Sequence, residues 1–144
     1  MKTTDEAQIL QRLDDWKAAF EAKDVDRMMA FYAPGDEFVA FDLMPPIQFV
    51  GEKMWRDNWV SFFDQFEGKL VVEMKDVKVH SSGDIAFIYG FTRLAGTMQG
   101  QPLDMWVRQT NCYRQTGGNW LIIHDHVSVP TDFATGRSLV DLQP

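Results

Sequence analysis

Apolar residues recur at helical spacing through the first half of the chain. The first such stretch has apolar residues three or four positions apart, at Ile9, Leu13, Trp16 and Phe20. Thr3 and Glu6 have capping-box spacing and predict where this helix begins. Asp24 can cap a short second helix. A third helix is predicted from Gly51, with an aromatic stripe of Trp55, Trp59, Phe62 and Phe66.

The second half of the chain reads as strands separated by turns. After a short early strand at 38–42, the predicted strands are Leu70–His80, Ile85–Ala95, Leu103–Arg114 and Trp120–Val129. The apolar phase changes near Asp76, which predicts a bulge and a bent strand. Strand 85–95 is apolar on both faces, so we expect helices to cover one side of the sheet and a second subunit the other. The order of elements predicts an α+β fold with a curved antiparallel sheet.

Composition narrows the classes of protein that remain. The 144 residues favour one domain over 1–144, with 130–144 as a turn-rich tail. A net charge of −7 without a Lys/Arg cluster argues against nucleic-acid binding and against docking on anionic membranes. The start of the chain lacks the pattern of a signal peptide, and the single cysteine, Cys112, cannot form an internal disulfide. We therefore expect a cytoplasmic protein.

Two of the three histidines stand close together in "HDHVSVP" (124–130). In an extended strand His124, His126 and Ser128 share one face, because side chains alternate. A metal site would need a third ligand, and no motif supplies one, so we expect none. Two readings stay open: the histidines act as acid, base or ligand donor, or they are structural and hydrogen-bonded to Ser128, Thr110 or the backbone.

Arg108 shares a strand face with Trp106 and Thr110. If that face looks into a cavity, its guanidinium needs a partner, because an unpaired buried charge is costly. The partner is either a structural carboxylate (Asp42, Asp104 or Asp125) or an oxygen of a ligand held by a bidentate clamp. Arg93 is a weaker candidate of the same kind.

Three stretches together resemble a known superfamily. They read "AFEAKDVDRMMAFYAPGDEFVAFD", "PPIQFVGEKMWRDNW" and "RQTNCYRQTGGNWLIIHDHVS". The order Arg-x-Thr, Gly hairpin, Trp and His-x-His-x-Ser is similar to the SnoaL-like branch of the nuclear-transport-factor-2-like superfamily. That superfamily also includes ketosteroid isomerases and the calcium/calmodulin-dependent protein kinase II association domain. The resemblance implies a cone, in which three helices wrap a curved sheet around an internal pocket.

The resemblance also implies a possible catalytic role for Asp42. "VAFDLMPPI" matches the place where ketosteroid isomerases carry a carboxylate base, which moves a proton next to a carbonyl. The alternative is an Asp that hydrogen-bonds the backbone of a turn. Those isomerases also use a tyrosine and a neutral aspartic acid as an oxyanion hole. Here Trp16 and an uncharged residue near Thr110 match those positions, which argues against an ordinary steroid isomerase.

The sequence thus predicts a cofactor-independent pocket for a small, partly apolar organic molecule. If it is an enzyme, we expect an isomerase or cyclase/lyase that transfers protons; the alternative is a non-catalytic module for ligand binding or self-association. The candidate catalytic residues are Asp42, His124 and His126. The candidate ligand-binding residues are Tyr32, Trp55, Trp59, Tyr89, Arg93, Trp106, Arg108 and Thr110. We expect a homodimer formed through the outer face of the sheet.

Overall fold

The computed structural model describes residues 3–144. Its α-helices are α1 (Thr4–Glu21), α2 (Val25–Met29) and α3 (Glu52–Asp64), and a single 3-10 turn spans Gly35–Glu37. The strands are β1 (Val39–Phe41), β2 (Phe49–Val50), β3 (Phe66–Ser82), β4 (Ile85–Met98), β5 (Gln101–Thr116), β6 (Asn119–Ser128), β7 (Thr131–Asp132) and β8 (Arg137–Ser138). The α+β order predicted from the sequence is confirmed.

Local chemistry fixes the helix starts. Thr3 Oγ1 accepts a hydrogen bond from Glu6 N at 3.1 Å at the N-cap of α1. Asp24 does the same for Arg27 N at the start of α2. Helix α3 begins after Gly51, whose φ of 89° suits glycine best. Phe66 was predicted on the aromatic stripe of this helix, but α3 ends before it and Phe66 opens β3.

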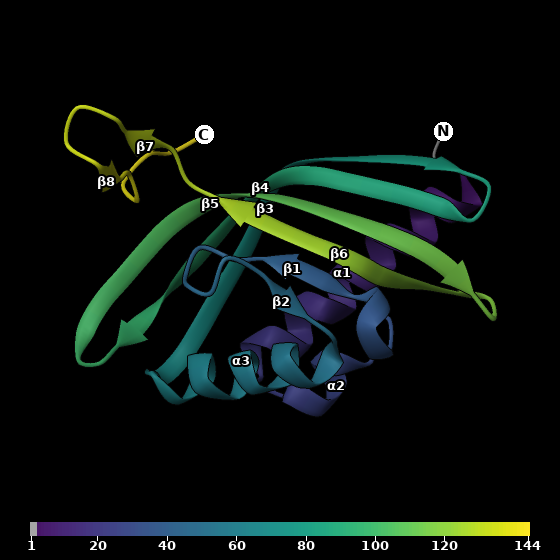
Figure 1. Cartoon of the computed structure of the whole chain (residues 1–144), viewed down its shortest axis with the longest axis horizontal. Helices are drawn as coiled ribbons and strands as arrows, with labels where there is room; N and C mark the ends of the chain where they lie inside the picture. Colours follow the sequence, from purple (N-terminus) through teal and green to yellow (C-terminus); the bar gives the residue numbers. More distant parts are fainter. Residues whose placement is uncertain (1–2) are drawn as a thin grey trace.

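Six strands form one mixed sheet in the order β2-β1-β6-β5-β4-β3. Strand β1 runs parallel to β6, and the other neighbours are antiparallel. The sheet arches over the three helices, which all lie on its inner side (Figure 1). The buried apolar core fills the space between these two layers.

Three register shifts interrupt the ladders of the sheet, and the first lies near the start of β3, between Glu67 and Val71. In β3 the register shifts between Lys75 and Lys78, and Asp76 has a φ of 56°, which confirms the predicted bulge. Gly90 on β4 faces this bulge, where a Cβ atom would lie 3.1 Å from the Lys75 carbonyl oxygen. The third shift, in β6, leaves Ile123 without a partner between the pairs Ile122–Tyr113 and His124–Cys112.

The C-terminal tail is more ordered than its sequence pattern predicts. Strands β7 and β8 pair as a short hairpin beyond the end of β6 (Figure 1). The last residues return to the main sheet, where Lys75 Nζ donates to the Pro144 carbonyl oxygen at 3.2 Å. Phe133 at the tip of the hairpin is 95% exposed.

Candidate functional site

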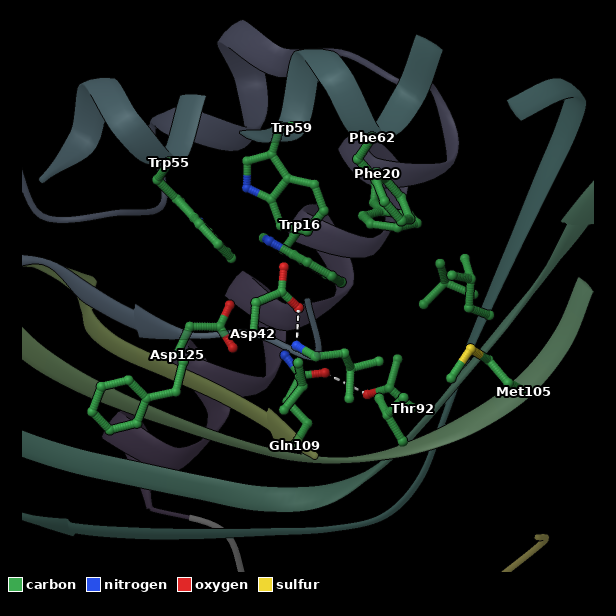
Figure 2. Close-up of a pocket in the computed structure, with 16 residues that line it drawn as sticks. Trp16, Phe20, Asp42, Trp55, Trp59, Phe62, Thr92, Met105, Gln109 and Asp125 are labelled. Carbon is green, nitrogen blue, oxygen red and sulfur yellow. Dashed lines mark hydrogen bonds between the residues drawn. The ribbon is translucent and has the colours of Figure 1, made fainter. Parts of the chain in front are cut away.

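A cavity of about 110 Å³ lies between the helices and the inner face of the sheet (Figure 2). Its lining comes from two helices, four long strands, the last residue of β1 and the segment that follows it. The lining residues are Trp16, Phe20, Phe41, Asp42, Leu43, Trp55, Trp59, Phe62, Val72, Thr92, Leu94, Met105, Val107, Gln109, Asp125 and Val127. The described lining includes no Lys, Arg or His, so an anionic ligand would meet no countercharge.

Aromatic side chains from α1 and α3 form one wall of the cavity (Figure 2). The Trp16 and Trp59 rings meet edge to face at 6.4 Å, and Phe20 contacts Trp59 at 5.5 Å in the same manner. The Trp59 indole N–H is buried and has no hydrogen-bond partner within residues 3–144. A buried donor without a partner is costly, so a ligand oxygen placed there would be favourable.

Asp42 follows β1 and points its carboxyl group into the cavity beneath Trp16 (Figure 2). Its Oδ1 accepts from Leu43 N at 2.7 Å, and its Oδ2 accepts from Asn58 Nδ2 at 3.4 Å. Burial raises the pKa of Asp42, while these two hydrogen bonds act in the opposite direction. The net effect is a raised pKa, so the two hydrogen bonds offset only part of the effect of burial on the Asp42 carboxylate.

Asp125 on β6 is the second carboxyl group of the cavity. Its side chain is only 4% exposed, and none of the ion pairs in the described part of the chain includes it. Burial, followed by the nearby charge of Asp42, raises the pKa of Asp125 to about 7. At and below neutral pH, Asp125 is thus in large part an uncharged acid beside a more readily ionised Asp42.

Three neutral polar residues complete the floor of the site. Thr92 Oγ1 donates to Gln109 Oε1 at 2.5 Å, as Figure 2 shows, and Gln109 Nε2 donates to Asn111 Oδ1 at 3.0 Å. Asn111 lies behind the cavity wall, is 1% exposed and pairs with Asp125 across the β5–β6 ladder. These residues form a buried polar row that ends at Asp125.

Four of the eleven predicted site residues lie at or behind this cavity. Asp42, Trp55 and Trp59 line it. Tyr32 lies behind them, where its hydroxyl accepts from Trp16 Nε1 at 2.8 Å. Tyr32 is therefore linked by a hydrogen bond to an indole that lines the cavity.

The other seven predicted residues lie on the outer face of the sheet, which corrects the expectation that the Arg108 face looks into the cone. Arg108 is exposed and donates to Ser128 Oγ at 3.0 Å. Arg93 pairs with Asp104 and Glu73. Strand alternation puts the remaining residues beside them on this face: Tyr89, Trp106, Thr110, His124 and His126.

The two histidines have partners on that outer side. His124 Nδ1 is 2.7 Å from the Val39 carbonyl oxygen. The Phe41 ring meets the rings of His124 and His126 edge to face at 4.7 and 5.3 Å. Asp42 and the two histidines lie on opposite sides of the sheet, so the fold does not bring them together in one active site.

The bulge at Ile123 explains this outcome. Trp120 and Ile122 point inward, so unbroken alternation would carry His124 and His126 inward too. The extra residue reverses the phase and turns Asp125 inward instead. The sequence reading therefore missed Asp125 and its neighbours Gln109 and Thr92. Gln109, the neighbour of Thr110, is an uncharged residue that lines the cavity.

The described residues provide neither a cluster of metal ligands nor a membrane-spanning helix. No group of three or more His, Cys, Asp or Glu side chains in residues 3–144 has the arrangement of a metal site. Within the same range, no helix is both long and apolar enough to cross a membrane.

Comparison with known proteins gives the family. The profile of the SnoaL-like domain matches residues 9–132. The chain belongs to the SnoaL-like domain family. A search of the curated proteins found no match.

Solved structures agree with this SnoaL-like assignment. An NTF2-like protein of unknown function from Pseudomonas putida KT2440 is 33% identical, with a TM-score of 0.89 over 100% of this chain and 99% of that one. A ketosteroid isomerase-like protein from Erwinia carotovora atroseptica is 22% identical (TM-score 0.75, 88% and 97% covered). A protein from Xanthomonas campestris, provisionally described as a calcium/calmodulin-dependent protein kinase II association domain, is also 22% identical (0.72, 83% and 84%). The last two support the fold alone.

Proposed function

We propose that this SnoaL-like protein is a cofactor-independent isomerase that moves a proton next to a carbonyl of a small uncharged molecule. The observation that carries the proposal is the pair of carboxyl groups in one largely apolar cavity, in environments that separate their protonation states. A base and an acid of the same residue type are then available together near neutral pH.

The environments assign the two roles. Asp42 accepts two hydrogen bonds that favour its carboxylate, so it is the base. Asp125 is buried without a cation and retains its proton, so it is the acid that donates to the carbonyl oxygen. Asp42 takes a proton from the carbon beside the carbonyl while Asp125 protonates the carbonyl oxygen, which gives an enol. Asp42 then returns its proton to another carbon, and the enol oxygen gives its proton back to Asp125 as the carbonyl re-forms. The overall change is an isomerisation, with no atom gained or lost.

The lining supports an uncharged ligand of about one ring. An apolar cavity of roughly 150 Å³ is known to admit benzene, and this cavity of about 110 Å³ is of similar order. Aromatic walls suit a flat carbon skeleton, and the polar floor suits one or two oxygens. The same acid and base would also serve the elimination step of a lyase.

The test uses 3-cyclohexen-1-one, an uncharged one-ring ketone that becomes the conjugated 2-cyclohexen-1-one when a proton moves from C2 to C4. We expect a rise in the ultraviolet absorbance of the conjugated enone, with a rate that Asp42→Asn lowers by about 10²-fold or more. The control is Asp141→Asn, at an exposed site in the tail. Equal rates for the two variants would contradict a catalytic Asp42.

The alternative is a binding module of the same fold. The unpartnered Trp59 N–H and the closely packed aromatic wall support ligand capture without chemistry. In that case we expect 4-methylphenol to bind at least tenfold more tightly than 4-methylbenzoate, because the cavity disfavours the charge of the benzoate. Quenching of tryptophan fluorescence measures both affinities, and the ketone should show no turnover.

We also propose that two copies pair through the outer face of the sheet, in the cytoplasm. Ile85, Phe87 and Tyr89 on β4 are 38%, 42% and 47% exposed. His80 stacks on Phe87 at 5.0 Å and widens this patch. Sedimentation should give a dimer that Phe87→Asp converts to a monomer, whereas Phe133→Asp on the exposed hairpin leaves it dimeric. A monomeric wild-type protein would contradict the proposal.

A further inference from the structure

The helix side of the cavity offers hydrogen bonds to a ligand only through indole N–H groups. The lining residues that come from α1 and α3 are all aromatic: Trp16, Phe20, Trp55, Trp59 and Phe62. A phenylalanine side chain has no polar atom, and an indole nitrogen is a donor that does not accept. A ligand that bonds to this side must therefore bring an acceptor.

Two of the three indoles are directed toward Tyr32 rather than toward a ligand. Trp16 Nε1 donates to the Tyr32 hydroxyl at 2.8 Å. Trp55 also interacts with that hydroxyl, although its N–H stays outside hydrogen-bonding geometry. The Trp59 N–H is buried and has no hydrogen-bond partner within residues 3–144. Trp59 is thus the donor that the helix side leaves for a ligand.

Packing holds the Trp59 ring in its orientation. The residue is 8% exposed. Its ring meets the Trp55 ring at 5.1 Å, stacks on Phe63 at 5.7 Å and contacts Phe20 edge to face at 5.5 Å. Aromatic rings are weak acceptors, so these contacts do not replace a bond to oxygen. The ring is preorganised, and its N–H keeps the cost of a buried donor without a partner.

The sheet side supplies the other donor of the cavity. Figure 2 shows Asp125 reaching the cavity from the sheet and Trp59 reaching it from the helices. A ring that fills the space between these layers presents an oxygen to each donor when its two oxygens lie on opposite sides of the ring. Water can satisfy the Trp59 N–H in the free protein. A ligand that displaces such a water without supplying an oxygen loses that hydrogen bond.

We propose that the Trp59 N–H binds a second oxygen of the ligand, so that the preferred substrates are uncharged one-ring ketones with another acceptor oxygen across the ring. The inference deepens the proposed function and rests on it for the carbonyl at Asp125. Trp59 determines specificity and takes no part in proton transfer. A carbonyl, hydroxyl or ether oxygen meets its requirement, whereas an ammonium group does not, because two donors would then face each other.

The experiment compares two uncharged rings of nearly the same shape. 1,4-Cyclohexanedione has a carbonyl at each end, and 4-methylidenecyclohexan-1-one has a CH₂ group in place of one carbonyl oxygen. An NMR titration at pH 6, where Asp125 keeps its proton, gives both dissociation constants for the wild type and for Trp59→Phe. The variant keeps an aromatic ring in the wall and removes the donor. We expect the preference for the dione, taken as the ratio of the two constants, to fall about tenfold in Trp59→Phe.

Trp120 on β6 provides the matched control. Its N–H is also buried without a partner in the described part of the chain, and the residue is 1% exposed, but it lies outside the cavity lining. Trp120→Phe should therefore leave the preference for the dione unchanged. A preference that Trp59→Phe does not reduce would overturn the inference. A fall of equal size in Trp120→Phe would overturn it too, because repacking would then explain both results.

The wild-type protein gives a second readout that needs no substitution. Each tryptophan has its own indole N–H signal in a proton–nitrogen spectrum. The dione should move the Trp59 indole proton to lower field than the methylidene ketone does, because a new bond to oxygen deshields it. The Trp120 signal should stay constant. If Trp59→Phe does not fold, this measurement still decides, and an equal response of the Trp59 signal to both ligands would contradict the inference.

Failure of this inference and failure of the proposed function give different results. An unchanged preference in Trp59→Phe together with turnover of 3-cyclohexen-1-one would refute the second oxygen site and leave the isomerase standing. A preference for the dione that depends on Trp59, without any turnover, would support the oxygen site and refute the isomerase.

Discussion

Polar side chains have opposite environments on the inner and outer faces of the sheet. On the outer face the charges of Arg93, Asp104 and Glu73 pair with one another at 2.8–2.9 Å near solvent. On the inner face Asp125 is buried beside amides and Asp42, with no cation among the lining residues. The outer charges form ion pairs near solvent, which contribute little to the unfolding free energy. A carboxyl group on the inner face must instead keep its proton, because a buried charge without a partner destabilises the fold.

This contrast bears on where the proposed chemistry would take place. The outer face carries most of the residue types that suggest catalysis, including both clustered histidines, and its polar groups already have partners such as Ser128 and the Val39 carbonyl. The inner face has few polar groups, but burial changes their proton affinity. Environment, rather than residue type, makes a group reactive.

The largest expected difference between the faces is in how Asp125 and His126, neighbours on β6, affect the pH dependence of the unfolding free energy. Asp125 has a folded-state pKa of about 7, above the value of about 3.9 in an unfolded chain. The stabilisation that the protonated Asp125 gives the folded state is fully present below pH 4 and is lost as the pH rises through 7. The loss lowers the unfolding free energy by up to about 4 kcal/mol. Asp125→Asn should remove this decline in unfolding free energy, and His126→Gln should retain it.

The measurement is urea unfolding at a series of pH values from 4 to 8 for the three proteins. The curve of Asp125→Asn is subtracted from that of the wild type, so that titration of Asp42 and other groups largely cancels. A difference curve that is flat across this range would mean that Asp125 is ionised in the folded protein.

The next difference concerns packing at two isoleucines of one strand. Ile88 points inward and is 3% exposed, whereas Ile85 points outward and is 38% exposed. Ile88→Ala should lower the unfolding free energy by about 3 kcal/mol, and Ile85→Ala by less than about 1 kcal/mol. Thermal unfolding at two protein concentrations checks this. A cost at Ile85 that grows with protein concentration would instead support burial of the outer face in a dimer.

The helices and the order of elements along the chain follow from the sequence, because helix caps and apolar spacing are local signals. Thr3, Asp24 and Gly51 mark helix starts that the structure confirms. Asp76 marks the bulge in β3 because the apolar phase changes there in the sequence itself.

The facing of the late strands is harder to predict. On β4 both faces are apolar, so alternation alone does not say which one is inner. On β6 the bulge at Ile123 has no Gly or Pro to announce it, and it reverses the phase just before His124. Asp125 could have been found from a different signal, since Val127 two residues on is apolar and in phase with it.

The smallest expected effect belongs to Arg108, the residue that the sequence presents as a ligand clamp. Its guanidinium is exposed, and its Nε donates to Ser128 Oγ on the neighbouring strand. Arg108→Gln should change the unfolding free energy by less than about 0.5 kcal/mol, as surface substitutions usually do. It should also leave the affinity for 4-methylphenol unchanged, because the side chain lies on the far side of the sheet from the cavity. Gln109→Met, one residue along, should weaken that affinity through the loss of a polar group that lines the cavity. Fluorescence titration of both variants measures this difference, and equal affinities would mean that the ligand does not reach the polar floor on which the proposed chemistry depends.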